Sequence, residues 1–347
     1  MKLEKKVIAN YDNKDIVRYN IKFENNFEVE MLNLGAIFTK IITPDKDNNF
    51  ENIIVGYKNI DSYFTNPSYM GATIGRTSGR IYNGDIVIND ISYKLNLNYN
   101  PHNGHGGSIG FDKKIWDVDI EQKNSSIILK MSIVSKDSEE NFPGNTNIKV
   151  EFEIFEDFKI VITYRATTDK TTLLNMTNHN YFNLSGNIKR PITTHDLKIK
   201  SKYILELDDT CAVTGKKLEV SNTAFDFNKL TNIGLRIDDN NSQIEIGSGY
   251  DHTYLFSENS NQIYMIDSIS KRELIIDTNQ NCVVVYSMNF TDDEILYNHK
   301  TNQRRYGICF ETQKPPIGKN MCFLNESILN PDQGYYHKTS YKFSLRK

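Results

Sequence analysis

Residues 147–165, NIKVEFEIFEDFKIVITYR, predict two antiparallel β-strands joined by a short turn. Apolar side chains take every second position on both sides of the break at Glu156-Asp157: Ile148, Val150, Phe152 and Ile154 precede it, and Ile160, Ile162 and Tyr164 follow it. Such alternation gives a strand one buried and one wetter face, which is the usual pattern of antiparallel sheets. We therefore expect a hairpin within a large antiparallel sheet.

The same two-residue period recurs along the chain. It predicts further strands at 127–133 and 27–31, with a hairpin turn at Asn89-Asp90 and a loop at 142–145. Short helical turns are expected at 61–64 and 228–230, whereas long amphipathic helices are scarce. Because no linker, repeat or shift in composition divides the chain, we predict one all-β domain over residues 1–347, a sandwich or a barrel.

The composition favours a globular protein that binds a small, weakly charged molecule. Of the 347 residues, 38% are hydrophobic, and 18 Phe with 20 Tyr can fill a large core. The net charge is only −3 and no basic block stands out, so the electrostatic signature of a nucleic-acid-binding protein is missing. No apolar run approaches the ~20 residues of a membrane span. We expect neither a nucleic-acid nor a membrane partner.

Cysteine content and the first residues predict a cytoplasmic location. The four cysteines form no CxxC pair, and their spacings suit neither zinc nor a disulfide framework. Residues 1–12 are charged and lack the apolar segment of a secretory signal. A nucleotide-binding fingerprint, a P-loop and a Gly-x-Ser-x-Gly elbow are missing as well. We expect a soluble cytoplasmic protein that uses no cofactor.

Two loops combine glycines with basic side chains that could reach a ligand. Residues 75–81 place Arg76 and Arg80 beside glycines, so that backbone and guanidinium groups could both approach ligand oxygens. Residues 101–107 present His102 and His105 among further glycines. These histidines are three positions apart, as metal ligands can be, but no third ligand lies nearby, so no metal site is predicted. Taken alone, each loop could also be a solvated, flexible bend.

Three further segments supply groups that suit proton transfer. His179 lies among amides and aromatic residues in 175–184, Asp251 lies in the Gly-Tyr-Asp-His run at 249–252, and Glu311 follows an apolar run in 307–313. A carboxylate at the end of a buried strand is costly unless it has a partner or a function. Two imidazoles, two carboxylates and an arginine are therefore candidates for acid–base chemistry.

Taken in order, these segments resemble the aldose 1-epimerase (galactose mutarotase) family. The likeness covers nearly the whole chain, at residues 33–36, 75–81, 105–107, 110–116, 177–186, 223–227, 249–252, 307–313 and 329–344. The resemblance implies a β-supersandwich of two large, mostly antiparallel sheets with an open sugar cleft. It also implies interconversion of the α and β anomers of a free hexose such as glucose or galactose. The oligomeric state stays open between a monomer and a homodimer.

Residue by residue, the resemblance assigns Glu311 as the catalytic base and His179 as the catalytic acid. His105 and Arg80 match residues that hold the sugar beside its ring oxygen, and Asp251 matches an aspartate that hydrogen-bonds sugar hydroxyls. We expect Glu311 and His179 to lie on opposite sides of a pyranose-sized hollow, with His179 acting as an imidazolium. Both groups then need pKa values near the operating pH.

Two positions depart from the pattern of the family. Gly79 stands where the family usually has an asparagine before the binding arginine, and Val284 stands where many members have a glutamine. Each change removes one possible hydrogen bond to a sugar hydroxyl, worth roughly 0.5–1.5 kcal/mol. These departures concern the preferred sugar and the affinity rather than the pair that transfers protons.

Three other functions fit part of the pattern. A non-catalytic carbohydrate-binding protein would bind sugars without accelerating mutarotation. An epimerase for phosphorylated or modified sugars would need additional basic side chains at the pocket, such as Arg76. A glycoside hydrolase would need two carboxylates about 5–10 Å apart; Glu311 and Asp251 are the obvious pair, but the histidines would then have no role.

Overall fold

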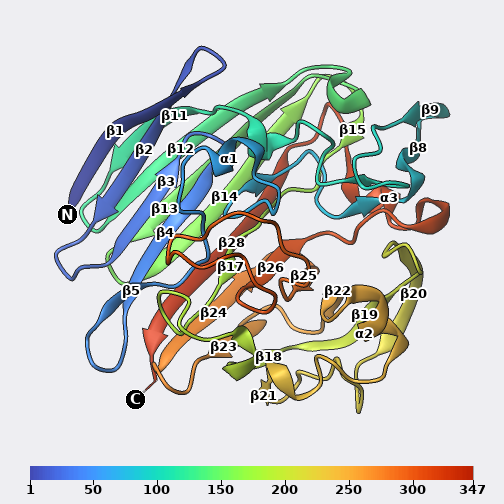
Figure 1. Ribbon diagram of the computed structural model, residues 1–347. Helices are drawn as coiled ribbons and strands as arrows, with labels where there is room; N and C mark the ends of the chain where they lie inside the picture. The colour runs from blue at the N-terminus through green and yellow to red at the C-terminus, as the bar shows by residue number, and fades with distance from the viewer. Residues whose placement is uncertain (347) are drawn as a thin grey trace.

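Antiparallel β-strands are the main regular structure of the computed structural model, which describes residues 1–346 (Figure 1). The three α-helices are short: α1 (Ser62–Thr65), α2 (Ser242–Gly247) and α3 (Leu324–Ser327). Within residues 1–346, no helix has both the length and the apolar character needed to cross a membrane. The strands form three large sheets, which are described in turn.

A nine-stranded antiparallel sheet is the largest element of the fold. Its strands, in spatial order, are β11 (Asp117–Gln122), β12 (Ser126–Ser135), β13 (Thr146–Phe155), β14 (Lys159–Thr168), β28 (Tyr335–Leu345), β24 (Arg272–Thr278), β23 (Ile263–Ile266), β18 (Asp196–Ile199) and β21 (Thr231–Asn232). The predicted hairpin at 147–165 is β13 and β14, and the predicted strand at 127–133 is β12. The carboxyl-terminal strand β28 lies between β14 and β24, so distant parts of the chain share one sheet.

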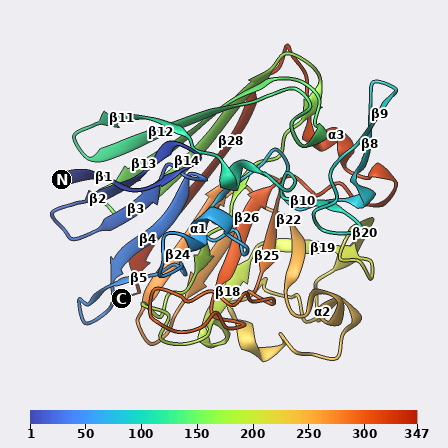
Figure 2. The ribbon, with the colours of Figure 1, turned by 45° about the horizontal axis from the view of Figure 1, so that its top comes forward.

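Two smaller sheets cover one face of this sheet. The first contains β1 (Lys2–Tyr11), β2 (Lys14–Lys22), β3 (Glu28–Leu32), β4 (Ile37–Pro44) and β5 (Phe50–Asn52); the second contains β17 (Tyr181–Phe182), β26 (Ile308–Gln313), β25 (Cys282–Tyr286), β22 (Asp251–Phe256), β19 (Ser201–Leu207) and β20 (Val213–Glu219). A bridge between Ile54 and Phe182 links them. The turned view shows the amino-terminal strands over the nine-stranded sheet (Figure 2). The predicted sandwich of large antiparallel sheets is therefore confirmed.

The alternating apolar side chains predicted from the sequence fill the space between the layers. On β13 the residues at 148, 150, 152 and 154 are buried, whereas their neighbours are exposed or half-buried. Phe38 of β4 meets Phe152 of β13 edge-on, with ring centres 5.4 Å apart, and Phe182 of β17 meets Tyr341 of β28 at 5.6 Å. Each such fully buried large side chain contributes about 1.5–3 kcal/mol relative to an exposed one.

Small two-stranded sheets and turns connect these layers. The pairs are β8 (Asp85–Ile88) with β9 (Ile91–Lys94), β7 (Arg80–Ile81) with β10 (Asn103–Gly104), β6 (Thr73–Ile74) with β16 (Thr177–Asn178), and β15 (Thr172–Leu173) with β27 (Ile328–Leu329). Asn89 and Asp90 both have positive φ, as a type I′ hairpin turn requires, which confirms that prediction.

Of the two predicted helical turns, one is confirmed and one is wrong. Residues 61–64 match α1, but residues 228–230 are not helical: 228 and 229 form a bend, and 230 has no regular structure. Here the Asp226 carboxylate accepts hydrogen bonds from the backbone and the side-chain amide of Asn228. Such local side-chain bonds offer the backbone an alternative to a helical turn.

Candidate active site

A cavity of about 330 Å³ lies over the six-stranded sheet, and all five residues singled out as site residues line it. Glu311 comes from β26 and Asp251 from β22, two strands of that sheet. Arg80, His105 and His179 come from β7 and from the loops after β10 and β16. The sheet therefore forms the floor of the cavity, and three connecting segments bring the basic side chains to it.

Glu311 is held on a central, fully buried strand. Ile308, Phe310 and Thr312 alternate with Cys309 and Glu311 along β26, so the last two share the face toward the cavity. Glu311 is only 3% exposed, and its Oε2 atom has no hydrogen-bond partner among residues 1–346. A buried carboxyl oxygen without a partner costs stability, which is typical of a functional group.

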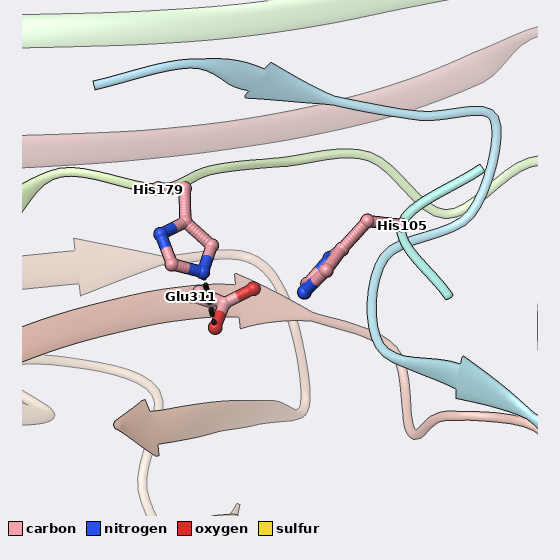
Figure 3. A group of neighbouring side chains, drawn as sticks. All are labelled: His105, His179 and Glu311. Carbon is pink, nitrogen blue, oxygen red and sulfur yellow. Dashed lines mark ion pairs between the residues drawn. The ribbon is translucent and has the colours of Figure 1, made fainter. Parts of the chain in front are cut away.

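His179 lies directly beside Glu311, in the short connection between β16 and β17. Its Nε2 atom is 3.5 Å from Glu311 Oε1, and a dashed line marks this pair in Figure 3. The expected placement on opposite sides of a hollow is therefore wrong. The reason is the sheet: β17 pairs with β26, with Tyr181 opposite Cys309, so the residue two before Tyr181 is brought next to the residue two after Cys309.

Backbone hydrogen bonds fix His179 in this position. Its N–H donates to the Ala72 carbonyl at 2.8 Å, and its own carbonyl accepts from the Gly71 N–H at 3.1 Å. The Asn178 side-chain amide donates to the Gly71 and Ala72 carbonyls as well. The side-chain amide of Asn178, the residue before His179, thus anchors the loop.

His105 approaches the pair from the other side of Glu311 (Figure 3). Its ring centre is 5.3 Å from that of His179, and one ligand-type atom from each of His105, His179 and Glu311 lies within 4.8 Å of the others. Such a group has the composition of a transition-metal site. The prediction of no metal site considered only His102 and His105. The three residues now found together lie far apart in the sequence.

Arg80 and Asp251 form an ion pair at the same cavity. The Nη1 atom of Arg80 is 3.6 Å from Oδ2 of Asp251, and its guanidinium lies 5.5 Å from the ring centre of Tyr99. Because Arg80 on β7 pairs with Gly104 on β10, the same short sheet sets the position of His105. Burial, the largest single effect, favours a lower pKa for Arg80, but the acidic groups around it, with Asp251 first among them, together outweigh burial and raise the pKa.

Burial shifts the pKa values of Glu311 and His179 in opposite directions. It raises the pKa of Glu311 to about 8; the negative charge of Asp251 adds to this rise, and the positive charge of Arg80 opposes it. It lowers the pKa of His179 to about 4 and that of His105 well below the ordinary value. Between these two limits the pair holds one proton, and it resides mainly on Glu311.

Several aromatic residues at the site were not predicted. The cavity is walled by Tyr69, Tyr99, Tyr181, Tyr286 and Phe290. The ring of Tyr69 lies 4.8 Å from that of His105, and the ring of Tyr181 lies 5.0 Å from that of His179. The chain has 20 tyrosines, and no spacing in the sequence separates these from core residues.

Two of the predicted ligand-binding candidates have structural roles instead. Arg76 is 2% exposed and donates to main-chain carbonyls and hydroxyls, away from the cavity. His102 is buried as well: its Nδ1 accepts from the Asn83 N–H, and its Nε2 bonds the Thr210 hydroxyl. A basic residue in a glycine-rich loop has the same local sequence whether it binds a ligand or hydrogen-bonds the protein itself, so the sequence does not separate the two roles.

The two positions that depart from the family pattern lie beside the site. Gly79 has φ of +73°, and a Cβ atom there would stand 2.8 Å from Cγ of Pro316. A larger residue at position 79 would therefore require Pro316 to shift. Val284 is 8% exposed, lies opposite Glu311 on the adjacent strand and does not line the cavity.

Comparison with known proteins places these features in a family. The family model described as aldose 1-epimerase matches residues 17–342. Galactose mutarotase of Mus musculus is 30% identical over 325 residues, 92% of each chain, and aldose 1-epimerase of Streptococcus thermophilus is 27% identical over all of this chain and 98% of its own. The crystal structure of galactose 1-epimerase from Lactobacillus acidophilus NCFM superposes with a TM-score of 0.90 at 27% identity, covering 100% and 99% of the two chains.

Proposed function

We propose, since this chain belongs to the aldose 1-epimerase family, that its central cavity interconverts the α and β anomers of a free aldose through Glu311 and His179. The activity is that of a carbohydrate isomerase acting on sugars such as glucose or galactose. The observation that carries the assignment of residues is the 3.5 Å separation of the carboxyl and imidazole groups at a cavity of about 330 Å³. The two oxygens that exchange protons are bonded to the same carbon, so an adjacent acid and base can reach both.

The chemical step opens and recloses the sugar ring. The Glu311 carboxylate takes the proton of the C1 hydroxyl, and the electron pair of that O–H bond forms the carbonyl. The bond between C1 and the ring oxygen breaks, and the ring oxygen takes a proton from the His179 imidazolium. Rotation about C1–C2 presents the other face of the aldehyde, and reclosure with the reverse proton flow yields the other anomer.

The opposed pKa shifts of Glu311 and His179 suit the two proton transfers that open the ring. A carboxylate whose conjugate acid is weak is a better base, and an imidazolium of low pKa is a stronger acid toward a poorly basic ring oxygen. The reactive form, carboxylate with imidazolium, holds the same single proton as the dominant form of the free enzyme, carboxylic acid with neutral imidazole. Moving that proton from Glu311 to His179 therefore prepares the site.

The remaining polar groups would hold the sugar. His105 and Arg80 are assigned to the ring oxygen and its neighbouring hydroxyls, and Asp251 to hydroxyl groups further around the ring. The tyrosine rings offer apolar faces for the C–H groups of the sugar. Polarimetry of freshly dissolved α-D-glucose and α-D-galactose, with xylose and arabinose for comparison, tests the activity and ranks the aldoses. A rate no faster than the spontaneous one for every sugar would leave only a binding function.

The pH dependence should follow the single proton of the pair. We expect kcat/KM to be highest between about pH 4 and pH 8 and to fall on both sides. Below this window the pair carries two protons and has no base, and above it the pair has no acid. Polarimetric rates, corrected for spontaneous mutarotation at each pH, check this. A rate that rises steadily through pH 9 would contradict it.

Replacing Arg80 by Ala should raise KM by roughly 10- to 100-fold, because charge-assisted hydrogen bonds to the sugar are each worth about 1.5–3 kcal/mol. The change also removes the positive charge that opposes the raised pKa of Glu311, so the alkaline limb of the profile should move to higher pH. Arg165→Ala, an exposed arginine on β14, is the control. A KM equal to that of the unmodified enzyme would show that Arg80 does not bind the sugar.

We also propose that the protein acts in the cytoplasm on monosaccharides, as a monomer or homodimer, with neither a nucleic acid nor a membrane as partner. Its four cysteines are free thiols, of which Cys282 and Cys309 are buried, a state that suits a reducing compartment. Sedimentation of the purified enzyme distinguishes the two oligomeric states.

A further inference from the structure

The imidazole of His179 has a second polar neighbour besides Glu311. The Sγ atom of Cys309 lies 3.5 Å from His179 Nδ1, within hydrogen-bonding range for sulfur. Cys309 is fully buried and faces the cavity side of β26, two residues before Glu311. The two nitrogens of one imidazole therefore meet two side chains of one strand: Nδ1 meets the thiol, and Nε2 meets the carboxyl group.

We propose that Cys309 is a positioning residue, whose thiol keeps His179 Nδ1 hydrogen-bonded and so directs the Nε2 proton toward the sugar ring oxygen. This inference rests on the proposed function of the Glu311–His179 pair. When the imidazole is charged, Nδ1–H can donate to the sulfur. After Nε2 has given its proton to the sugar, the neutral imidazole keeps Nδ1–H on the sulfur and leaves Nε2 free to take the proton back, so the same contact serves both halves of the reaction.

Sulfur has a specific advantage at this position. A carboxylate against Nδ1 would stabilise the imidazolium and make it a weaker acid. A thiol is a weak donor and a weak acceptor, so it orients the ring without adding charge. Burial also raises the pKa of the Cys309 thiol well above its ordinary value, and the nearby negative charges of Glu311 and Asp251 act in the same direction. The thiol thus stays protonated in the working range of the enzyme.

The other ionisable groups around His179 do not duplicate this contact. They are Glu311, His105, Tyr69, Tyr181 and Tyr286, with Arg80 and Asp251 further along the cavity. The Tyr181 hydroxyl donates to the Ser68 carbonyl, and the Tyr286 hydroxyl accepts from the Phe290 N–H. Among residues 1–346, Cys309 is the side chain that hydrogen-bonds His179 Nδ1.

Three substitutions separate orientation from packing. Cys309→Val fills the same space without a polar atom, whereas Cys309→Ser keeps a donor and an acceptor in less volume. Cys309→Ala removes the polar group and also reduces the volume. Cys282→Ala is the matched control, because this cysteine is equally buried on the neighbouring strand β25 and its thiol donates to the Gln313 carbonyl instead. Polarimetry gives kcat and KM across pH, and the ¹⁵N signals of the His179 ring report which nitrogen carries the proton.

If Cys309 positions His179, the Val and Ala variants should lose roughly 10- to 100-fold in kcat, as is typical for groups that orient a functional histidine. KM should change little, and the Ser variant should recover most of kcat. The acidic limb of the pH profile should move to lower pH in the Val variant, because a buried Nδ1–H without an acceptor disfavours the imidazolium. The neutral ring should also lose its preference for the Nδ1-protonated form, whereas Cys282→Ala should match the unmodified enzyme.

The opposite pattern would overturn the inference: full activity and an unchanged pH profile in the Val variant, with a defect in the Ser variant, would mean that Cys309 only fills space. His179→Gln separates this outcome from a failure of the proposed function. If His179→Gln keeps normal rates, the assignment of the acid fails. If it is inactive while Cys309→Val is normal, only the role of Cys309 fails.

Discussion

Glu311→Gln should lower kcat by roughly 10³-fold or more while leaving the fold intact. General base assistance contributes typically 10²–10⁴-fold, and an amide cannot take the C1 hydroxyl proton. Glutamine has the same shape, so packing around β26 should not change, and KM should rise only slightly. Polarimetry measures the loss. A rate within a few-fold of the unmodified enzyme would reject Glu311 as the base.

The same substitution should stabilise the protein at neutral pH. The pKa of Glu311 is raised from 4.5 to about 8, so above pH 4.5 the unfolded state gains free energy by ionising this group and the folded state does not. At about 1.36 kcal/mol per pKa unit, the cost at pH 7 slightly exceeds about 3 kcal/mol, and we expect Glu311→Gln to recover about 1–3 kcal/mol of it. The gain should grow between pH 4.5 and 8 and vanish below pH 4.5.

Urea unfolding at acidic and neutral pH measures this gain. Glu219→Gln on β20 is the control, because that side chain is exposed and its replacement should leave stability unchanged. An inactive variant whose gain in stability over the unmodified protein is no larger at pH 7 than at pH 4.5 would show that Glu311 is ionised in the folded state. The catalytic and the thermodynamic result can thus be judged separately.

Arg76→Met should destabilise the protein by about 3–5 kcal/mol, as expected when a buried charged network loses one partner. Arg76 donates to the carbonyls of Ser135, Lys136, Pro143 and Gly144 and to the hydroxyls of Ser135 and Thr172. Methionine has a similar length but no donor, and each buried acceptor left without a partner costs about 1–3 kcal/mol.

The free energy of unfolding in urea measures this loss, with the exposed Arg165→Met as the control. A loss below about 1 kcal/mol would mean that water or a shifted backbone replaces the guanidinium. We also expect weaker sugar binding in the Arg76 variant, because residues 75–81 carry Arg80 to the cavity. That effect should be smaller than the one caused by changing Arg80 directly.

Much of the fold could be predicted from the sequence, since the strand signal is local. Alternating apolar residues at 148–154 and 160–164 have the same two-residue period as the buried faces of β13 and β14, and the hairpin turn at Asn89-Asp90 needs only the tolerance of these residues for positive φ. The helical turn predicted at 228–230 failed because one side chain, that of Asp226, bonds the backbone locally.

The sequence by itself also determined which residue types were available for chemistry, and all five proposed site residues line one cavity. It did not determine how they are used there. Arg76 and Arg80 share one glycine-rich loop, but one is a buried structural donor and the other faces Asp251 across the cavity. Only the tertiary structure separates them, because the partners of Arg76 lie some 60 to 100 residues away along the chain.

The arrangement of the acid and base was decided by strand pairing. Tyr181 is opposite Cys309 only because β17 joins the edge of the sheet next to β26, and this register brings His179, Cys309 and Glu311 together. The opposed pKa shifts of Glu311 and His179 come from burial under the same layers, and no single segment of the sequence specifies that burial. Alternation and turn chemistry act over a few residues and can be read from the sequence, whereas desolvation and contact between distant strands exist only once the sheets have packed.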